Sequence, residues 1–393
     1  MSPGNASVQG GPAQISRGGL LVRKFFIAAC ASTAVIGMSM YSAAAASASA
    51  TAAQARSAAR SVIVVGPNQS IQRAVNRAHP GTTIVLKKGV YHQAVMIRKN
   101  RITLRGAGNS LHGTVLRPPR HRPRTLCTSG FGLTGVCVLA RKLDPETGKV
   151  FQRVRGVKVA GIYVAGFPGN GVFGYGTNGL TVTRVSAFHD GDYGISRFVS
   201  THTVFADDIA VGNDEAGFYV GDSPLADTVV RNDIAEGNEF GIFVRHARHV
   251  TVSHNLVTGN CQGILVLDDG QPGGAGNARI AHNTVIRNNK FCPKHGDTPV
   301  AVKGGGILLL GATHTLVIHN VVRGNQGHLF NSGGIVLLSA ARLTKGANPS
   351  FDTILDNRAF NNHPADLIWD RTGVGNRFRG NKCGKSIPRG LCH

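Results

Sequence analysis

The sequence predicts an all-β fold, a right-handed parallel β-helix, and a repeat in three parts supports this prediction. An eight-residue phrase occurs seven times, and its last residues are Asp190, Asn213, Asn238, Asn260, Asn288, Asn325 and Asn362. These residues are separated by 23, 25, 22, 28, 37 and 37 positions, and the short separations set the period. A short apolar segment precedes several copies, and a Gly with alternating apolar residues follows the first six. Fixed periods of this length are typical of solenoids.

Strand pairing between repeats explains this pattern better than hairpins do. Each repeat holds two or three short strands, and its turns are not of the Asn-Gly type that closes hairpins. If each strand pairs with its copy in the next repeat, the backbone is satisfied and equivalent side chains stack. Inward Ile, Val and Leu then form columns, and Asn255, Asn283, Asn320 and Asn357 form an amide ladder inside a turn. A leucine-rich repeat does not fit, because Leu does not recur at fixed offsets and no helix fits between the strands.

The predicted β-helix domain covers residues 62–393, with an all-β core and one short helix. Residues 70–78 place Ile71, Ala74, Val75 and Ala78 on one side, which predicts an amphipathic helix that caps the open end of the core. Strands are expected at 83–86, 95–97 and 102–104. Loop insertions are expected at about 117–155, 291–303, 326–332 and 340–350.

The first residues resemble an export signal. A polar stretch ends at Arg23 and Lys24, an apolar run follows to about Tyr41, and Ala-rich A-x-A patterns come next. This layout predicts a signal peptide at 1–50, an Ala/Ser-rich linker at 51–61, and a secreted protein. An uncleaved membrane anchor is the alternative. After cleavage we expect no stable membrane insertion, since no second apolar span occurs.

Six cysteines remain once Cys30 leaves with the signal peptide, and an even number in an exported chain favours disulfides. The sequence-neighbour pairs Cys127/Cys137, Cys261/Cys292 and Cys383/Cys392 are the expected bridges. None of the cysteines has C-x-x-C spacing, so zinc or thioredoxin-like chemistry is a poor interpretation of them.

The strongly basic balance favours a polyanionic partner. The formal net charge is +23, but the Lys and Arg residues are scattered rather than gathered in runs or interleaved with aromatics. No helix-turn-helix, zinc finger or stacking-sheet motif is present, so we expect no nucleic-acid partner. A polysaccharide or a cell-envelope glycan is the expected partner.

Several repeated phrases resemble a known superfamily. Gly89-Val90-Tyr91, the segment 102–106 (ITLRG), and the G-I-x-V and x-H-N-x-V-x-x-N repeats are similar to the pectin-lyase-like right-handed β-helix superfamily. The resemblance covers about 62–393 and implies the fold. It implies function only broadly, because the superfamily includes lyases, polygalacturonases, alginate epimerases and non-enzymatic proteins. The sharper motifs of these enzymes are absent, and the sole Trp369 is followed by Asp370-Arg371 rather than by W-x-D-H.

The candidate site therefore comes from geometry. In G-I-x-V the residue x points outward, so Phe173, Ser196, Tyr219, Phe243 and Leu265 form an outer column whose aromatics could stack on sugar rings. Acidic residues precede the glycines, and basic and acidic residues follow them. The predicted catalytic residues are Asp192, Glu215, Tyr219, Asp222, Glu239, Arg245 and His246, and the predicted substrate-binding residues are Phe173, Arg197 and Phe243.

This arrangement suits β-elimination of a polyuronate, in which a C5 proton is removed, the carboxylate is neutralised and the leaving oxygen is protonated. Arg245 or His246 would be the base or the neutralising group, and Tyr219 the acid. Asp192, Glu215 and Asp222 could hold Ca²⁺, and paired carboxylates could alternatively hydrolyse a glycosidic bond. The alternative is that these residues have no catalytic role and are solvated turn residues beside exposed aromatics.

A column of histidines, His254, His282 and His319, is interpreted as solvated turn residues rather than a metal site. Two functions stay open. The first is a secreted enzyme, a lyase, epimerase or hydrolase, that acts on an acidic polysaccharide. The second is a non-catalytic β-helix that binds glycans or the cell envelope.

Overall fold

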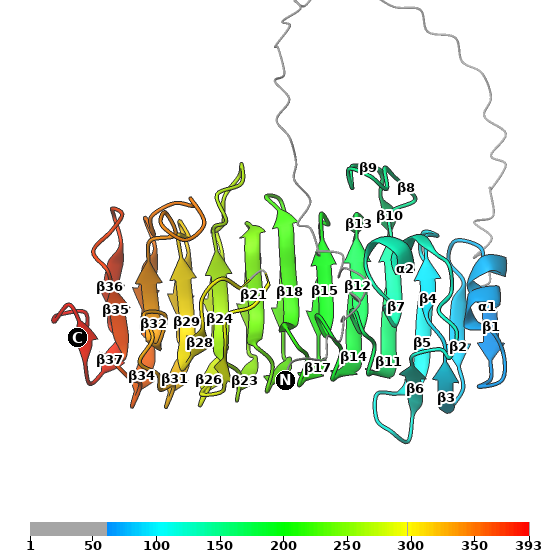
Figure 1. Cartoon of the computed structure of the whole chain (residues 1–393), viewed down its shortest axis with the longest axis horizontal. Helices are drawn as coiled ribbons and strands as arrows, with labels where there is room; N and C mark the ends of the chain where they lie inside the picture. Colours follow the sequence, from blue (N-terminus) through cyan, green and yellow to red (C-terminus); the bar gives the residue numbers. More distant parts are fainter. Residues whose placement is uncertain (1–60, 297, 393) are drawn as a thin grey trace, which may run out of the picture. The chain divides into compact units, whose positions relative to one another are not determined.

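Successive turns of the chain stack along one axis as a parallel β-helix (Figure 1). The computed structural model describes residues 61–296 and 298–392. The predicted signal peptide (1–50) and nearly all of the predicted linker (51–61) lie outside the described residues. Among the residues described, no helix is long and apolar enough to cross a membrane.

One face of the β-helix is an 11-stranded sheet, here called sheet B, in which every pairing is parallel. Its strands in chain order are β4 (Val95–Ile97), β7 (Val136–Leu139), β12 (Val172–Tyr175), β15 (Ile195–Phe198), β18 (Ala216–Ser223), β21 (Phe240–Ala247), β24 (Gln262–Leu267), β29 (Gly305–Leu310), β32 (Gly333–Leu338), β35 (Leu367–Trp369) and β38 (Ser386–Ile387).

The other two faces join into a 21-stranded sheet, sheet A, because the long strands β11 and β14 belong to both. One face contains β1 (Val62–Val65), β2 (Thr83–Leu86), β5 (Thr103–Gly108), β11 (Lys158–Ala165), β14 (Thr181–Phe188), β16 (Val204–Ala206), β19 (Thr228–Arg231), β22 (Val250–Ser253), β25 (Arg279–Ala281), β30 (Leu316–Ile318), β33 (Thr353–Leu355) and β36 (Arg377–Arg379). The second contains β3 (Gly89–His92), β6 (Thr114–Arg117), β17 (Ile209–Val211), β20 (Ile234–Glu236), β23 (Leu256–Thr258), β26 (Thr284–Ile286), β31 (Val321–Arg323), β34 (Arg358–Phe360) and β37 (Lys382–Cys383).

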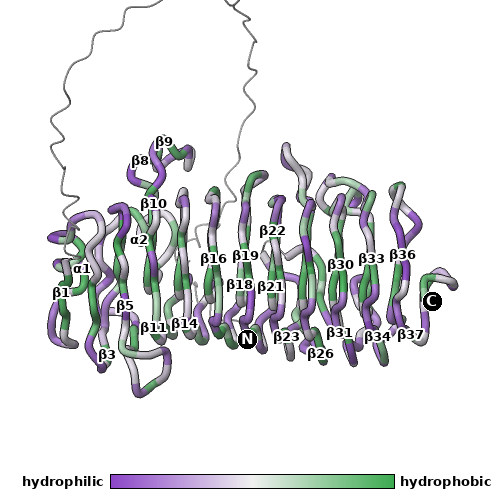
Figure 2. Tube along the Cα trace, turned by 180° about the vertical axis from the view of Figure 1, so that it is seen from behind, coloured by the Kyte–Doolittle hydropathy of each residue, from purple (hydrophilic) through white to green (hydrophobic). Residues whose placement is uncertain are grey.

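Alternation along these strands builds the core. In sheet B, Phe218 pairs with Ile242 and Ile242 with Ile264, and these side chains are fully buried inside the coils. Apolar and polar segments accordingly alternate around each coil (Figure 2). The predicted pairing of each strand with its copy in the next repeat is confirmed.

The turns are held by buried amide ladders. Asn238 donates its backbone N–H and its Nδ2 to Oδ1 of Asn260, at 2.9 and 3.1 Å, and Asn260 bonds in the same way to Asn288. Asn255, Asn283, Asn320 and Asn357 form a second ladder of this kind. Each amide thus satisfies its neighbour and a strand carbonyl, which removes the penalty for burying it.

The N-terminal end is capped as predicted. Helix α1 (Ile71–Arg77) begins after Ser70, whose hydroxyl accepts a hydrogen bond from the backbone N–H of Arg73 at 3.2 Å. Ile71, Ala74 and Val75 are buried in the main core cluster. The helix therefore closes the apolar end that the first coil would otherwise expose.

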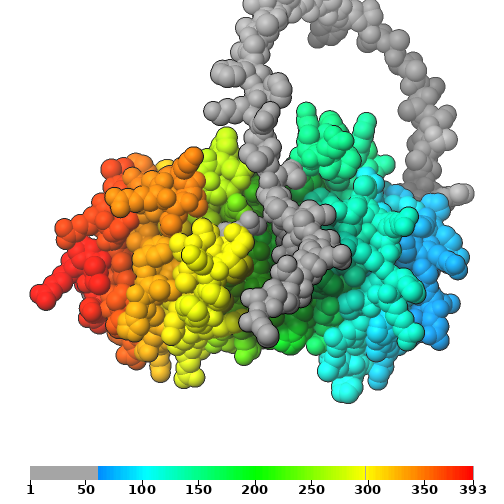
Figure 3. Space-filling model, viewed as in Figure 1, coloured from blue at the N-terminus to red at the C-terminus, as the bar shows by residue number. Residues whose placement is uncertain are grey.

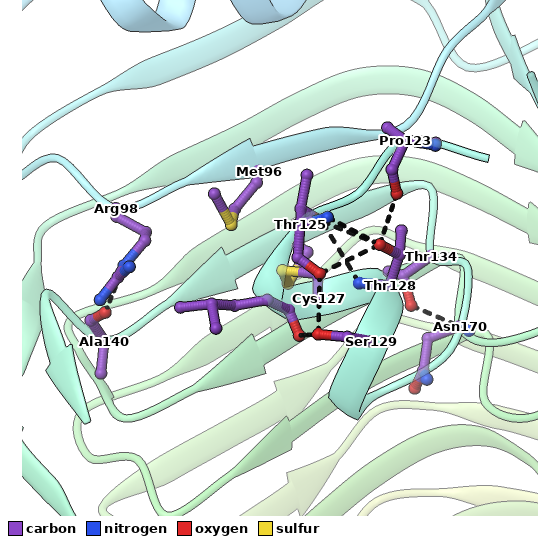
Figure 4. Close-up of a disulfide and its surroundings, with 12 residues drawn as sticks. Met96, Arg98, Pro123, Thr125, Cys127, Thr128, Ser129, Thr134, Ala140 and Asn170 are labelled. Carbon is purple, nitrogen blue, oxygen red and sulfur yellow. Dashed lines mark hydrogen bonds between the residues drawn. A yellow bond between two sulfur atoms is a disulfide. The ribbon is translucent and has the colours of Figure 1, made fainter. Parts of the chain in front are cut away.

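The predicted disulfides are confirmed: Cys127–Cys137, Cys261–Cys292 and Cys383–Cys392. The first fixes helix α2 (Leu126–Gly130) to β7, beside Thr125 and Thr128, which form the capping box of this helix (Figure 4). The prediction of one irregular loop over 117–155 is wrong in part, because β7 lies within it and pairs with β4 and β12. Its apolar sequence VCVL has the pattern of a sheet-B strand, although the residues that flank it do not match the repeat.

Short strands occupy the remaining irregular regions. A hairpin of β8 (Lys142–Leu143) and β9 (Val150–Gln152) precedes β10 (Val154–Arg155), which pairs with β13 (Thr177–Asn178). In the insertion at 291–303, β27 (Phe291–Cys292) pairs with β28 (Val302–Lys303).

Candidate active site

The outer face of sheet B carries most of the predicted residues, and loops cover parts of this face. Phe131, after α2, packs on Phe173 and Tyr175 with ring centroids 4.9 and 5.0 Å apart. Farther along, Cys292 and Val302 of one insertion and Ala340 of another join the apolar cluster on this face. The yellow insertion near residue 300 and the orange insertion near residue 345 stand out there (Figure 3). Strands β15, β18, β21 and β24 present the candidate residues between these regions.

The outer aromatic column points outward as predicted, but the expectation of exposed rings is wrong. Phe173, Tyr219 and Phe243 are only 3%, 1% and 5% exposed. Tyr219 packs on Tyr193 and Phe243, with centroid distances of 4.5 and 5.3 Å. These rings form a second apolar layer outside the coil rather than an open platform for sugars. The sequence pattern gave the direction of the side chains and could not show what covers them.

The prediction that Arg197 is a substrate-binding residue on the outer face is wrong. It pairs in register with Val220, so its side chain points into the coil interior and is fully buried. Its guanidinium donates to Ser223 Oγ, to Thr228 Oγ1 at 2.7 Å and to the carbonyl of Ala226 at 3.1 Å. Burial lowers its pKa to about 9. Arg197 therefore braces the turn after β18 from inside and does not face a substrate on the outer face.

Carboxyl groups gather where the sheet-B strands begin. Asp192 and Glu215 share a hydrogen bond, and the hydroxyl of Tyr193 donates to Glu215 Oε1 at 2.7 Å. Burial first, and then the charge of Asp192, raises the pKa of Glu215 to about 8. A carboxyl group that is mostly protonated at neutral pH can act as a general acid.

Glu239 belongs to the same acidic column but has a different partner. It is 1% exposed, and its Oε2 lies 2.8 Å from Nε2 of His295 in the insertion at 291–303. Burial raises the pKa of Glu239, and the contact with His295 opposes this change. Glu239 therefore anchors a loop to the strand edge.

A second group lies where the strands end. Arg245 donates from Nε to Oδ2 of Asp269 at 3.2 Å, and His246 Nδ1 lies 3.7 Å from Oδ1 of Asp222. Burial alone would lower the pKa of His246, but Asp222, the Pro272 carbonyl and Asp269 raise it. Arg245 and His246 are neighbours in sequence, yet both reach this edge because His246 has a positive φ of 45°. The structure thus brings Asp222, Arg245 and His246 together at one end of the strands, apart from Asp192, Glu215 and Glu239 at the other end.

Asp269 was missed by the sequence prediction. It lies just after β24, within Asp268-Asp269-Gly270, and the charged residues after the two preceding phrases, Asp222 and Arg245, could have pointed to it. Its side chain is 5% exposed, and Nε2 of Gln271 also donates to Oδ2 at 2.6 Å.

Tyr219 connects the two groups. Its ring contacts Tyr193 on one side, and its hydroxyl lies over Gly221, where an added Cβ would come within 2.4 Å of that oxygen. Burial raises the pKa of Tyr219, and the charge of Asp222 adds to this rise while Arg245 opposes it. The absence of a side chain at Gly221 thus lets the phenol lie over the residue that pairs in register with Arg245.

The predicted sharing of one Ca²⁺ by Asp192, Glu215 and Asp222 does not fit the structure. Strand β18 (Ala216–Ser223) runs from Glu215 to Asp222. At ~3.3 Å per residue its two ends are about 20 Å apart, so the carboxylates cannot meet at one ion. The sequence spacing hid this, because both residues flank the same strand.

Two further features lie outside the candidate site. A hollow lined by Asn100, Arg141, Phe151, Arg153 and Arg155 lies at the β8–β9 hairpin. His254, His282 and His319 are exposed. The rings of His254 and His282 are stacked and those of His282 and His319 are tilted, each pair with a centroid distance of 5.0 Å.

Comparison with known proteins places the fold. The family model for the right handed beta helix region matches residues 170–383, more than half of the 393 residues, so the chain belongs to this family. A search of curated proteins finds no match.

Solved structures agree on the architecture. The A-module of a mannuronan C-5 epimerase from Azotobacter vinelandii superposes with a TM-score of 0.55 at 18% identity, over 79% of this chain and 81% of that chain. An alginate lyase from Paenibacillus sp. str. FPU-7 gives 0.54 at 16% identity, over 80% and 99%. A DFA-IIIase from Arthrobacter chlorophenolicus A6 gives 0.53 at 11% identity, over 78% and 77%. At such identities the likeness shows the fold.

Proposed function

We propose that this right-handed β-helix protein is a secreted enzyme that acts on an acidic polysaccharide by elimination or epimerisation at a uronate residue. The observation that carries the proposal is that the Tyr219 hydroxyl lies over Gly221, the residue that pairs in register with Arg245 on the outer face of sheet B. Both reactions begin with removal of the proton next to a carboxylate, which requires a cation to stabilise the developing charge.

The roles follow from the side chains. Arg245 stays protonated, so it neutralises the substrate carboxylate rather than acting as a base. Asp269 holds its Nε, which leaves the terminal nitrogens for the substrate. In its ionised form, which the charge of Arg245 favours, the Tyr219 phenolate accepts the C5 proton. The phenol so formed protonates the leaving oxygen in elimination, whereas water protonates the opposite face of C5 in epimerisation. His246 and Asp222 position this end of the site.

Other features support an acidic, extracellular substrate. The chain is strongly basic, with a net charge of +23, and Arg141, Arg153 and Arg155 line the hollow near the β8–β9 hairpin. This hairpin stands at the edge where the sheet-B strands end, as Arg245 does (Figure 1). Three disulfides suit an oxidising compartment. The mannuronan epimerase and the alginate lyase named above carry these activities on a similar fold.

The test is a substrate screen with the purified full chain on pectate, alginate, hyaluronan and heparin, and on inulin as a neutral control. Absorbance near 235 nm reports elimination, NMR of the uronate signals reports epimerisation, and reducing ends report hydrolysis. We expect Arg245→Ala to lower the rate by about 100-fold or more, and Tyr219→Phe by about 100-fold. Arg231→Ala, an exposed arginine on sheet A, is the matched control and should retain the rate.

Hydrolysis is the second candidate, and the paired Asp192 and Glu215 favour it. In that case reducing ends would appear without 235 nm absorbance, and Glu215→Gln would abolish them while Arg245→Ala would not. If no product forms from any substrate and the protein still binds the glycans, the enzyme proposal fails and a non-catalytic glycan-binding protein remains.

A further inference from the structure

Asp222, His246 and Asp269 converge at the ends of β18, β21 and β24. One ring nitrogen of His246 and one carboxylate oxygen from each aspartate lie within 4.8 Å of one another. The three residues come from successive coils, so the stacking of the fold, rather than one flexible loop, brings them together.

The orientation of His246 points to a bound cation. The residue is 7% exposed, and its Nε2 lies 2.9 Å from the carbonyl oxygen of Pro272. A carbonyl only accepts, so Nε2 carries a proton, and Nδ1 is the ring nitrogen that remains to bind a cation. Nδ1 is buried without a hydrogen-bond partner, 3.7 Å from Asp222 Oδ1. That distance is too long for a hydrogen bond but close to the separation of about 3.4 Å between two ligands of a tetrahedral ion.

The surroundings hold the ligands in place. Asp269 accepts hydrogen bonds from Arg245 Nε at 3.2 Å and from Gln271 Nε2 at 2.6 Å, which fix its carboxylate. The Pro272 carbonyl fixes the imidazole in the same way. Such outer contacts are typical of metal ligands, because they set the tautomer and the direction of each donor atom.

The backbone of the loop after β24 allows the Pro272 carbonyl to reach His246. Gly273 has φ of 108°, and a Cβ there would lie 2.7 Å from Cγ of Pro224. Only glycine permits this backbone to pack against the turn after β18 and to place the Pro272 carbonyl over His246.

We propose that Asp222, His246 and Asp269 form a binding site for a first-row divalent cation, best matched by Zn²⁺. One imidazole and two carboxylates are the nitrogen and oxygen ligands that Zn²⁺ takes, whereas Ca²⁺ and Mg²⁺ prefer oxygen alone. Three protein ligands leave a fourth position open to water or substrate. This site goes beyond the proposed function, since it requires no polysaccharide activity.

The experiment measures metal binding by the full chain after removal of metals with a chelator. Zn²⁺ is titrated calorimetrically, and bound zinc is counted by elemental analysis after gel filtration. We expect one Zn²⁺ bound by the three residues, and a weakening of its affinity by at least about tenfold in His246→Gln and in Asp222→Asn. Because Asp222 is more exposed, Asp222→Asn keeps the test valid if His246→Gln misfolds, which circular dichroism would reveal.

The exposed histidine column supplies the matched control, because stacked imidazoles could also take Zn²⁺. His282→Ala should leave the tight site intact. The proposal is overturned if the wild-type chain binds no Zn²⁺ at micromolar concentrations, if His282→Ala removes the tight site while Asp222→Asn does not, or if Ca²⁺ binds these residues more tightly than Zn²⁺. Zinc binding without any polysaccharide turnover would uphold this site and reject the proposed function separately.

Discussion

The same turn position is filled by asparagine in the later coils and by aspartate in the earlier ones, and the two regions differ in how they satisfy it. Asn255 donates Nδ2 to Val230 O at 3.1 Å and to Asn283 Oδ1 at 2.9 Å. Asp233, one coil earlier, accepts from the Asp208 N–H at 2.8 Å with Oδ1, but its Oδ2 is buried without a partner. Burial raises the pKa of Asp233 to about 8.

The comparison teaches that a ladder position needs a donor as well as an acceptor. An amide supplies both, so the ladder continues at no net loss. A carboxylate supplies acceptors only, so it stays buried most easily when protonated. The coils with aspartate lie in the region of the candidate site, while the later coils form a more uniform scaffold.

Breaking the amide ladder should have the largest effect. In Asn260→Ala, the backbone N–H of Asn238 and the carbonyl of Ala235 lose the partner that Asn260 supplies, and the Nδ2 of Asn238 keeps only the carbonyl of Ala210. Leaving these buried groups unsatisfied should lower the free energy of unfolding by about 3 kcal/mol or more, measured by urea denaturation. His254→Ala, an exposed turn residue, should change it by less than about 0.5 kcal/mol. An equal loss in both variants would show that the ladder is not what stabilises the turn.

Replacing the carboxyl group of Asp233 with an amide should instead stabilise the fold, and the effect should depend on pH. In the wild type, the unfolded Asp233 ionises near 3.8 and the folded residue near 8, so the folded state retains the proton between these values. The stability contribution is therefore complete below about pH 4 and is lost as the pH rises through 8. Asp233→Asn should raise the free energy of unfolding by about 2 kcal/mol at pH 9 and change it little at pH 4.

Thermal melts at both pH values measure this difference. Glu236→Gln removes an exposed carboxylate from the same coil and should show no such pH dependence. If Asp233→Asn is no more stable than the wild type at pH 9, the unpartnered Oδ2 of Asp233 does not destabilise the folded state.

A smaller effect is expected at Asp352, which lies in a later coil. Its Oδ1 accepts from the Thr315 N–H at 2.7 Å, its Oδ2 has no partner, and burial raises its pKa to about 7 despite the opposing hydrogen bonds from Thr315. Asp352→Asn should stabilise the chain by about 1 kcal/mol at pH 8 and by less at pH 4. Chemical denaturation measures the change in the free energy of unfolding, with Asp356→Asn as the exposed control. A larger increase in Asp352→Asn than in Asp233→Asn would contradict the expected order of the two effects.

Much of the fold could be predicted from the sequence, and so could part of the site. The spacing of the Asn-ending phrases predicted that Asn238 and Asn260 are neighbours, and the G-I-x-V phrase predicted that Tyr219 points outward. Arg197 was mistaken for an outer residue, although its place after Ile195 and Ser196 matches that of the inward Val220. Asp269 was missed because Leu267 occupies the position of Arg245 in its coil, and the charged residues follow only after it.

The sequence by itself determined the stacking of the coils, the inward and outward faces and the capping helix, because each depends on a period or on neighbouring residues. It favoured the three disulfides between neighbouring cysteines, and the structure established them. Only the tertiary structure decided which outward side chains are covered and which charged groups meet. The outward side chains are covered by insertions that follow no period. Asp222, His246 and Asp269 come from different coils, and no local sequence pattern specifies how the turns bring them together. Burial and charge contacts are sums over such distant neighbours, so they arise only when the chain is folded.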